Sequence, residues 1–326
     1  MSDPDHDIPT SHYNDTHRAY LQSLNACQTT TFEKSKPILA AIFSAHDRPT
    51  APEDITQEDF ESYISTLTDA LSPFDLEIRS SLHQRSKERI YALVNVESDA
   101  MTQMATVHTP DEIAFVKRVL DAMFERYNTE RAEVMAVTSL QALKCAKVGA
   151  AESGNATQGA KAADLTMSQA ERMLEAMVEE GWFDLSQKGF YSLSQRGIME
   201  LRSWLVEMYN DEGDEEQDDD EVQHIRIKDC AACRDIVTVG QRCPNLPCNT
   251  RVHNGCLRNF LRIHRDEKCP GCGTLWKDAP PVGEKAARNV PGGGGRRSTN
   301  GTAAGRSSVV TNGHEDGEED DESDDE

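Results

Sequence analysis

Seven cysteines and one histidine lie close together near the end of this 326-residue sequence. Their spacing is C-x2-C-x9-C-x4-C-x4-H-x2-C-x12-C-x2-C, formed by Cys230, Cys233, Cys243, Cys248, His253, Cys256, Cys269 and Cys272. Zinc binds four thiolate or imidazole ligands in tetrahedral geometry, so eight ligands predict two closed structural zinc sites. Closed sites have no open position for water, which argues against zinc-catalysed hydrolysis. Disulfide bonding is the alternative, but nothing else in the sequence indicates an oxidising compartment.

The residues around these ligands are too few to fold without metal. The segment 222–278 contains few large apolar side chains and is shorter than chains that usually build a core of their own. Structural zinc contributes on the order of 10–16 kcal/mol in small modules. We therefore expect residues 222–278 to form a module whose fold depends on two zinc ions.

Acidic residues are concentrated in two blocks. The net charge is −23, but nine acidic residues lie in 211–221 and ten in 315–326, which leaves 38 acidic against 34 basic residues elsewhere. Such blocks repel themselves and stay solvated. We expect a disordered acidic linker at 211–221, a disordered acidic tail at 279–326 and a disordered N-terminus at 1–12.

No segment has the pattern of a secretory signal or a membrane span. The first residues, Met1-Ser2-Asp3-Pro4-Asp5, are acidic and polar, and the longest strongly apolar stretch covers only about residues 37–43. We expect an intracellular protein that has no membrane partner.

Residues 13–107 show three helical patterns followed by a β-hairpin. The third helix is expected to begin at Thr56, with Asp59 placed as in a capping box, and its apolar residues recur with a 3.6-residue period. The period then changes to the alternation of strands, around 76–80 and 90–94, with a polar loop between them. Three helices followed by a hairpin is the element order of a winged-helix domain.

Residues 108–210 repeat this order. The expected elements are a helix capped by Thr109 with Pro110 in its first turn, a helix over Val134–Leu143, a helix behind Thr166 or Ser168, strands at 182–185 and 190–193, and a helix after Ser194. The predicted fold class is therefore α+β, with two tandem winged-helix domains, 13–107 and 108–210, ahead of the zinc module.

The sequence gives little support for direct DNA binding by either unit. The third helix of the second unit offers Gln169 and Arg172 for base contacts, but four glutamates beside them would repel a polyanion. The first unit has a basic hairpin loop, whose basic residues are Arg79, Arg85, Lys87 and Arg89. This loop could touch a phosphate backbone or could simply be solvated. We expect protein–protein contacts, with DNA bound only weakly or through a complex.

Two kinds of zinc module share the observed ligand order, the PHD finger that reads histone tails and the RING finger of ubiquitin ligases. The four-residue spacing before His253 suits a PHD finger. However, Glu267 occupies the position of that module's usual aromatic residue, and no aromatic lies between Cys233 and His253 to wall a methyl-lysine cage. The motif Cys269-Pro270-Gly271-Cys272 and a helical stretch at 257–264 favour the RING finger.

Several further motifs resemble one family over residues 13–276. They are Tyr13-Asn14-Asp15-Thr16-His17-Arg18, Phe32-Glu33-Lys34-Ser35-Lys36-Pro37-Ile38, Tyr91-Ala92-Leu93-Val94-Asn95 and Gly181-Trp182-Phe183, together with the cysteine-rich end. The sequence is similar to the RING-containing non-SMC element, subunit one, of the SMC five/six DNA-repair complex. This resemblance implies two winged-helix domains and a variant RING, a MAGE-type winged-helix partner, a kleisin partner, and a role in ubiquitin ligation and DNA repair on chromosomes in the nucleus.

The resemblance also implies interleaved zinc sites. Their ligand sets would be Cys230, Cys233, His253 and Cys256 for one ion, and Cys243, Cys248, Cys269 and Cys272 for the other. A RING finger has no catalytic side chain. It holds a ubiquitin-charged conjugating enzyme so that the thioester is oriented for attack by lysine.

The positions that dock a conjugating enzyme in RING fingers are only partly matched. Phe260 or Leu261 could serve on the helix, and Pro270 matches the proline near the seventh ligand. Alanines replace the usual aliphatic residue between the first two ligands, and Gly273 replaces the arginine that often follows the last one. We therefore expect a ligase that depends on its partner. The competing hypotheses are a non-catalytic scaffold subunit of the same complex and, less favoured, a PHD-type chromatin reader.

Overall fold

The computed structural model describes residues 13–96, 107–147, 164–210, 225–263 and 267–289. The expected disordered N-terminus, the acidic linker at 211–221 and the tail from residue 290 onward lie outside the described residues. Within the described ranges, no helix has the length and apolar character that a bilayer crossing requires.

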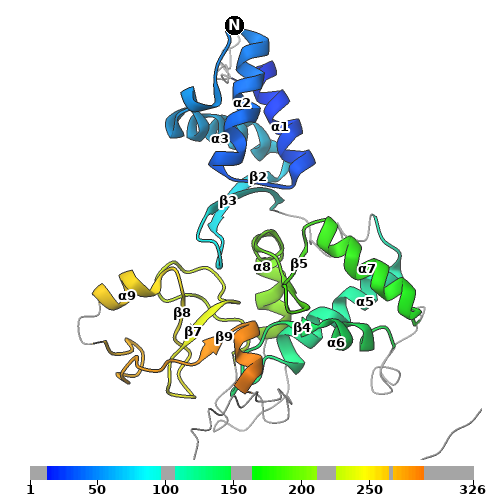
Figure 1. Ribbon diagram of the computed structural model, residues 1–326, viewed down its shortest axis with the longest axis vertical. Coiled ribbons are helices and arrows are strands. Elements are labelled where there is room, and N and C mark those ends of the chain that lie inside the picture. Colours follow the sequence, from blue (N-terminus) through cyan, green and yellow to red (C-terminus); the bar gives the residue numbers. More distant parts are fainter. Residues whose placement is uncertain (1–12, 97–106, 148–163, 211–224, 264–266, 290–326) are drawn as a thin grey trace, which may run out of the picture. The chain divides into compact units, whose positions relative to one another are not determined.

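Helices and a β-hairpin form the N-terminal unit (Figure 1). Its elements are α1 (Asp15–Cys27), β1 (Thr29–Thr30), α2 (Phe32–His46), η1 (Pro52–Asp54), α3 (Gln57–Leu71), η2 (Ser72–Phe74), β2 (Leu76–Leu82) and β3 (Arg89–Asn95). Thr56 caps α3 and Asp59 completes the capping box, as the sequence predicted. β2 and β3 pair antiparallel over their full length, and β1 adds to the other edge of β3.

The core of this unit lies between its helices and its sheet. Tyr20, Phe60 and Leu67 are buried, and the ring of Phe60 meets that of Tyr91 from β3 edge to face at 4.9 Å. These contacts fix the hairpin relative to the helices, which matters because the turn of the hairpin reaches the zinc module.

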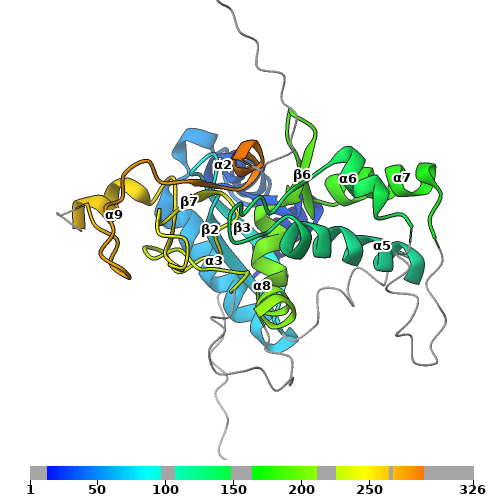
Figure 2. The same ribbon diagram turned by 90° about the horizontal axis from the view of Figure 1, so that it is seen from below.

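The second unit has the same order of helices followed by a hairpin and then continues into a helix. Its elements are α5 (Pro110–Asp121), the π-helical turn η3 (Ala122–Arg126), β4 (Val137–Thr138), α6 (Ser139–Lys144), α7 (Met167–Glu179), β5 (Phe183–Leu185), β6 (Phe190–Leu193) and α8 (Gln195–Asn210). Figure 2 shows α5, α6 and α7 lying together, and α7 packs on both of the other helices. The sheet order is β4-β6-β5.

The predicted helix over Val134–Leu143 is wrong in its first half. Val137 pairs with Tyr191 as part of β4, and the helix starts only at Ser139 because Thr138 caps it, with Gln141 completing the capping box. The β-branched Val134 and Val137 suit this extended backbone better than a helix.

The zinc module contains β7 (Gly240–Arg242), β8 (Arg251–His253) and α9 (Leu257–Ile263). It continues through β9 (Pro281–Val282), which pairs with β7, and η4 (Glu284–Asn289). The expectation that the disordered tail begins at residue 279 is therefore wrong for its first residues, because backbone pairing with β7 and burial of Ala286 against Ala132 and Val134 hold them in place.

The predicted α+β class, with a cysteine-rich module at the C-terminal end, is confirmed. The assignment of the first two units as winged-helix domains stays a prediction, although both have the predicted order of helices followed by a hairpin.

Candidate metal centre

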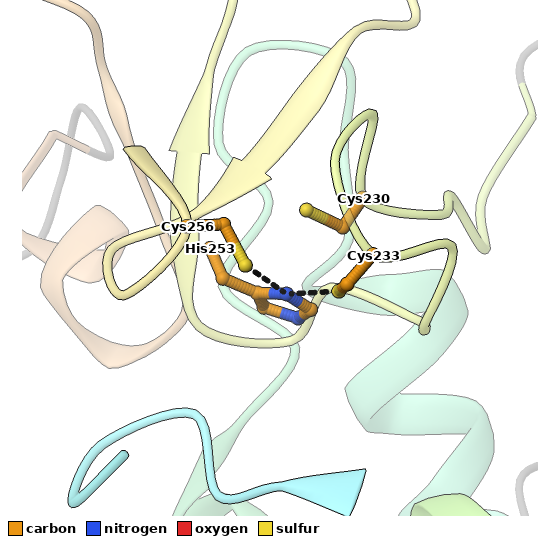
Figure 3. Close-up of side chains that lie close together, drawn as sticks. All are labelled: Cys230, Cys233, His253 and Cys256. Atoms are coloured by element: carbon orange, nitrogen blue, oxygen red, sulfur yellow. Dashed lines mark hydrogen bonds between the residues drawn. The ribbon is translucent and has the colours of Figure 1, made fainter. Parts of the chain in front are cut away.

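The first cluster brings together Cys230, Cys233, His253 and Cys256, whose ligand atoms all lie within 4.8 Å of one another (Figure 3). The Nδ1 atom of His253 is 3.2 Å from the sulfur of Cys233 and 4.0 Å from that of Cys256. The other ring nitrogen, Nε2, donates a hydrogen bond to the carbonyl of Ile236 at 3.1 Å. This bond leaves the Nδ1 lone pair facing the three sulfurs, which is how second-shell partners orient histidine ligands.

The second cluster contains Cys243, Cys248, Cys269 and Cys272, again within 4.8 Å. The sulfurs of Cys243 and Cys272 are 3.5 Å apart, and those of Cys248 and Cys269 are 3.6 Å apart. A disulfide would need about 2.05 Å, whereas two thiolates on a tetrahedral zinc with bonds of about 2.3 Å lie about 3.8 Å apart. These distances fit metal ligation and not disulfide bonding.

The donor sets suit zinc in number, type and spacing, so each cluster could hold one ion. The hydrogen bond between Cys230 and Cys233 lowers the pKa of Cys230 and raises the pKa of Cys233, so these two sulfurs share one proton that zinc would displace. A hydrogen bond from Thr274 lowers the pKa of Cys272 to about 6. Burial raises the pKa of Cys243, so its proton must be displaced by the metal. The clusters contain the two interleaved ligand sets that the family resemblance implied.

A buried ion cluster joins the zinc module to the second unit. The Glu133 carboxylate accepts hydrogen bonds from Arg251 Nε at 2.6 Å and from Lys228 Nζ at 3.0 Å. Burial alone would raise the pKa of Glu133, but the hydrogen bond and charge of Arg251 and the charge of Lys228 outweigh it, and the pKa is lowered. Arg251 also donates to the carbonyl of Cys248 at 2.7 Å, which ties this cluster to the second metal site. Sequence reasoning missed Glu133, because a single acid in an irregular segment carries no pattern.

The hairpin of the first unit contacts the zinc module through Gln84, which is 7 % exposed. Its amide group bonds to the backbone of Ile236, Thr238 and Val239. The sequence placed Gln84 in a polar loop, but no feature of the sequence showed its partner.

The basic loop of the first unit is largely engaged within the chain. Arg79 donates to the carbonyl of Met199, Arg85 to the hydroxyl of Ser192, and Arg89 to the hydroxyl of Ser80. The side chain of Lys87 lies against Gly255. These contacts anchor the loop, while Arg85, Lys87 and Arg89 still face solvent.

The three predicted docking residues differ in accessibility. Phe260 is only 2 % exposed and packs on Trp276 with ring centroids 5.3 Å apart, so its prediction as an accessible docking residue is wrong. Leu261 is partly buried and Pro270 is exposed. A cavity of about 500 Å³ opens between the two zinc loops and is lined by Ala231 from the first and Gly271 from the second.

The comparisons with known proteins agree with this organisation. Residues 17–201 match the model of the Nse1 non-SMC component of SMC5-6 complex, and residues 230–272 match a RING-like domain. The chain is 22% identical over 267 residues to the human non-structural maintenance of chromosomes element 1 homolog, covering 82% of this chain and 86% of that protein. It is 22% identical over 223 residues to the element 1 of Schizosaccharomyces pombe, covering 68% and 79%.

A solved structure shares the fold. A chain of an Nse1-Nse3-Nse4 complex superimposes with a TM-score of 0.61 at 20% identity, covering 81% of this chain and 97% of that one. The family model spans more than half of the sequence and a RING-like domain covers the cysteine cluster. The chain therefore belongs to the family of Nse1 non-SMC components of the SMC5-6 complex.

Proposed function

We propose that this protein is a RING-type ubiquitin ligase subunit of the SMC5-6 complex, active together with a MAGE-type winged-helix partner. The observation that carries the proposal is the pair of interleaved four-ligand clusters within a RING-like domain. Two zinc ions would hold the two loops apart at a fixed distance, as a RING needs in order to present a charged conjugating enzyme. The chain would contribute by positioning the ubiquitin-charged conjugating enzyme, since a RING supplies no catalytic side chain.

The surface available for docking consists of Leu261, Pro270 and the cavity between the zinc loops. Pro270 and the cavity are open to solvent, and Leu261 is partly so. The small side chains of Ala231 and Ala232 and the burial of Phe260 reduce the apolar area on offer. This reduced area is the reason to expect weak activity from the chain alone.

The proposed partners follow from the solved structural neighbour, which is a complex of Nse1, Nse3 and Nse4. We propose that this chain likewise pairs with a MAGE-type subunit and a kleisin, and that it acts in DNA repair on chromosomes in the nucleus. The two N-terminal units would supply the protein–protein surfaces as winged-helix domains.

Ubiquitin discharge from a panel of charged conjugating enzymes tests the proposal, with the chain alone and with its MAGE-type partner. Zinc content is measured in the same samples. Partner-dependent discharge is the expected result. Absence of discharge from a fully zinc-loaded pair would contradict ligase activity and favour a scaffold role.

The scaffold role is the second candidate, and one observation favours it. The zinc module is hydrogen-bonded to both preceding units, to the first through Gln84 and to the second through Glu133. Such contacts suit a module whose role is to fix the arrangement of the units that bind the partner subunits. In that case, substitution of Leu261 would leave complex assembly and cell survival after DNA damage unchanged.

A further inference from the structure

One backbone carbonyl links the first metal cluster to the N-terminal unit. The oxygen of Ile236 accepts a hydrogen bond from His253 Nε2 at 3.1 Å and another from Gln84 Nε2 at 3.0 Å. His253 is a ligand of the first cluster, and Gln84 lies in the turn between β2 and β3, 152 positions before Ile236. The residue that orients the histidine is therefore itself held by another part of the chain.

The amide of Gln84 holds this segment at three backbone groups. While its nitrogen donates to Ile236, its Oε1 atom accepts from the backbone N–H of Thr238 at 3.0 Å and of Val239 at 2.8 Å. Gln84 is 7 % exposed, so these bonds form away from bulk water, where an unpaired partner is costly. The segment 236–239 cannot move without breaking them.

A second residue of the same hairpin supports the neighbouring position. Ser81 donates to the Asp235 carboxylate at 3.4 Å, and the Asp235 carbonyl accepts from the N–H of Cys230, another ligand of the first cluster, at 2.8 Å. The second cluster has a different support, because Arg251 holds the Cys248 carbonyl while paired with Glu133 of the second unit. The first site is thus supported from the first unit, and also by Arg202 of α8, which donates to the Arg234 carbonyl at 3.0 Å, whereas the support of the second site comes from the second unit.

We propose that Gln84 is a positioning residue for the first zinc site. It fixes the Ile236 carbonyl, the carbonyl fixes the His253 ring, and the ring keeps Nδ1 directed at the ion. Outer-shell partners of metal-bound histidines are typically worth about 10- to 100-fold in metal affinity. Gln84 acts through one further bond, so its loss is expected to lie near the lower end of that range, at about 10-fold.

The test measures zinc release from the full chain to a chelating dye under native conditions. Gln84→Ala removes all the bonds, and Gln84→Glu keeps the acceptor oxygens but loses the N–H that reaches Ile236. Gln57→Ala is the matched control, because Gln57 is an exposed glutamine of the same unit that bonds to Glu61 on its own helix. In both Gln84 variants one of the two zinc ions should leave about 10-fold faster, with the other ion and the control at the wild-type rate.

Cobalt substitution identifies the ion that leaves. Cobalt bound by three thiolates and an imidazole absorbs differently from cobalt bound by four thiolates, so the first site should lose its spectrum first. Release at the wild-type rate from both Gln84 variants would overturn the proposal. So would equal acceleration of both ions, since that indicates general loosening of the module. If Gln84→Ala cannot be purified with two zinc ions bound, the zinc release rate of Gln84→Glu alone tests the proposal.

Discussion

Glu133 and Arg251 form a buried ion pair across 118 positions of the sequence, with side chains 0 % and 2 % exposed. Two nitrogens of the guanidinium contact the two carboxylate oxygens, and Lys228 adds a second cation at 3.0 Å. The pair joins the segment before β4 to strand β8, beside the second metal site. The single negative charge of Glu133 is therefore the counter-charge of two buried cations, Arg251 and Lys228.

Removing this carboxylate should strongly destabilise the protein. Glu133→Gln keeps the shape but leaves Arg251 and Lys228 buried without a counter-charge, a situation that costs about 3–5 kcal/mol. Chemical denaturation of the zinc-loaded chain measures the loss. Glu171→Gln, at an exposed site on α7, is the matched control and should change the unfolding free energy by less than about 0.5 kcal/mol. A loss in Glu133→Gln no larger than that of the control would contradict this account of the pair.

The same pair should make stability depend on pH in the acidic range. Because the pKa of Glu133 is lowered from its ordinary value of 4.5, its charge stabilises the folded state above that pH. This stabilisation is lost as the pH falls through the lower pKa of the folded state. The difference in unfolding free energy between wild type and Glu133→Gln should stay constant above pH 4.5 and shrink below it. If the difference in unfolding free energy grew on acidification instead, the pKa of Glu133 would be raised in the folded protein and not lowered.

Loss of metal should unfold the zinc module. Cys256→Ser removes one ligand of the first cluster, and a chelator removes both ions; structural zinc of this kind contributes on the order of 10 kcal/mol. Trp276 is 7 % exposed, so unfolding of the module should shift its fluorescence to longer wavelength. Cys27→Ser, at an exposed cysteine outside both clusters, should retain two zinc ions and the native spectrum. A Cys256→Ser variant that still binds two ions would contradict the ligand assignment.

Neighbouring residues on α9 should respond differently to substitution. Phe260→Ala opens a cavity against Trp276 and should cost about 3–5 kcal/mol, whatever the function. Leu261→Ala removes a partly buried side chain and should cost less, yet under the proposed function it should lower ubiquitin discharge several-fold at full zinc content. Discharge and unfolding measured on both variants separate these effects. Unchanged discharge in Leu261→Ala would remove this residue from the docking surface.

The features that could be predicted from the sequence are those that depend on local pattern and on ligand chemistry. Soft ligands in close pairs predicted two zinc sites, because few other structures need such spacing. Thr56 with Asp59, and Thr109 with Pro110, marked helix starts because capping signals act over only a few residues. Even the α+β class follows from the change of hydrophobic period along the chain.

The folded structure was needed to show which distant residues support the zinc sites and which side chains face solvent. Gln84 and Glu133 carry no local signal, because their partners lie 152 and 118 positions away. Spacing likewise could not show that Phe260 points into the core and Leu261 partly outward, since adjacent helical positions differ only in what packs against them. Hydrogen bonds and burial between distant segments depend on the assembled fold, and no short stretch of sequence encodes them.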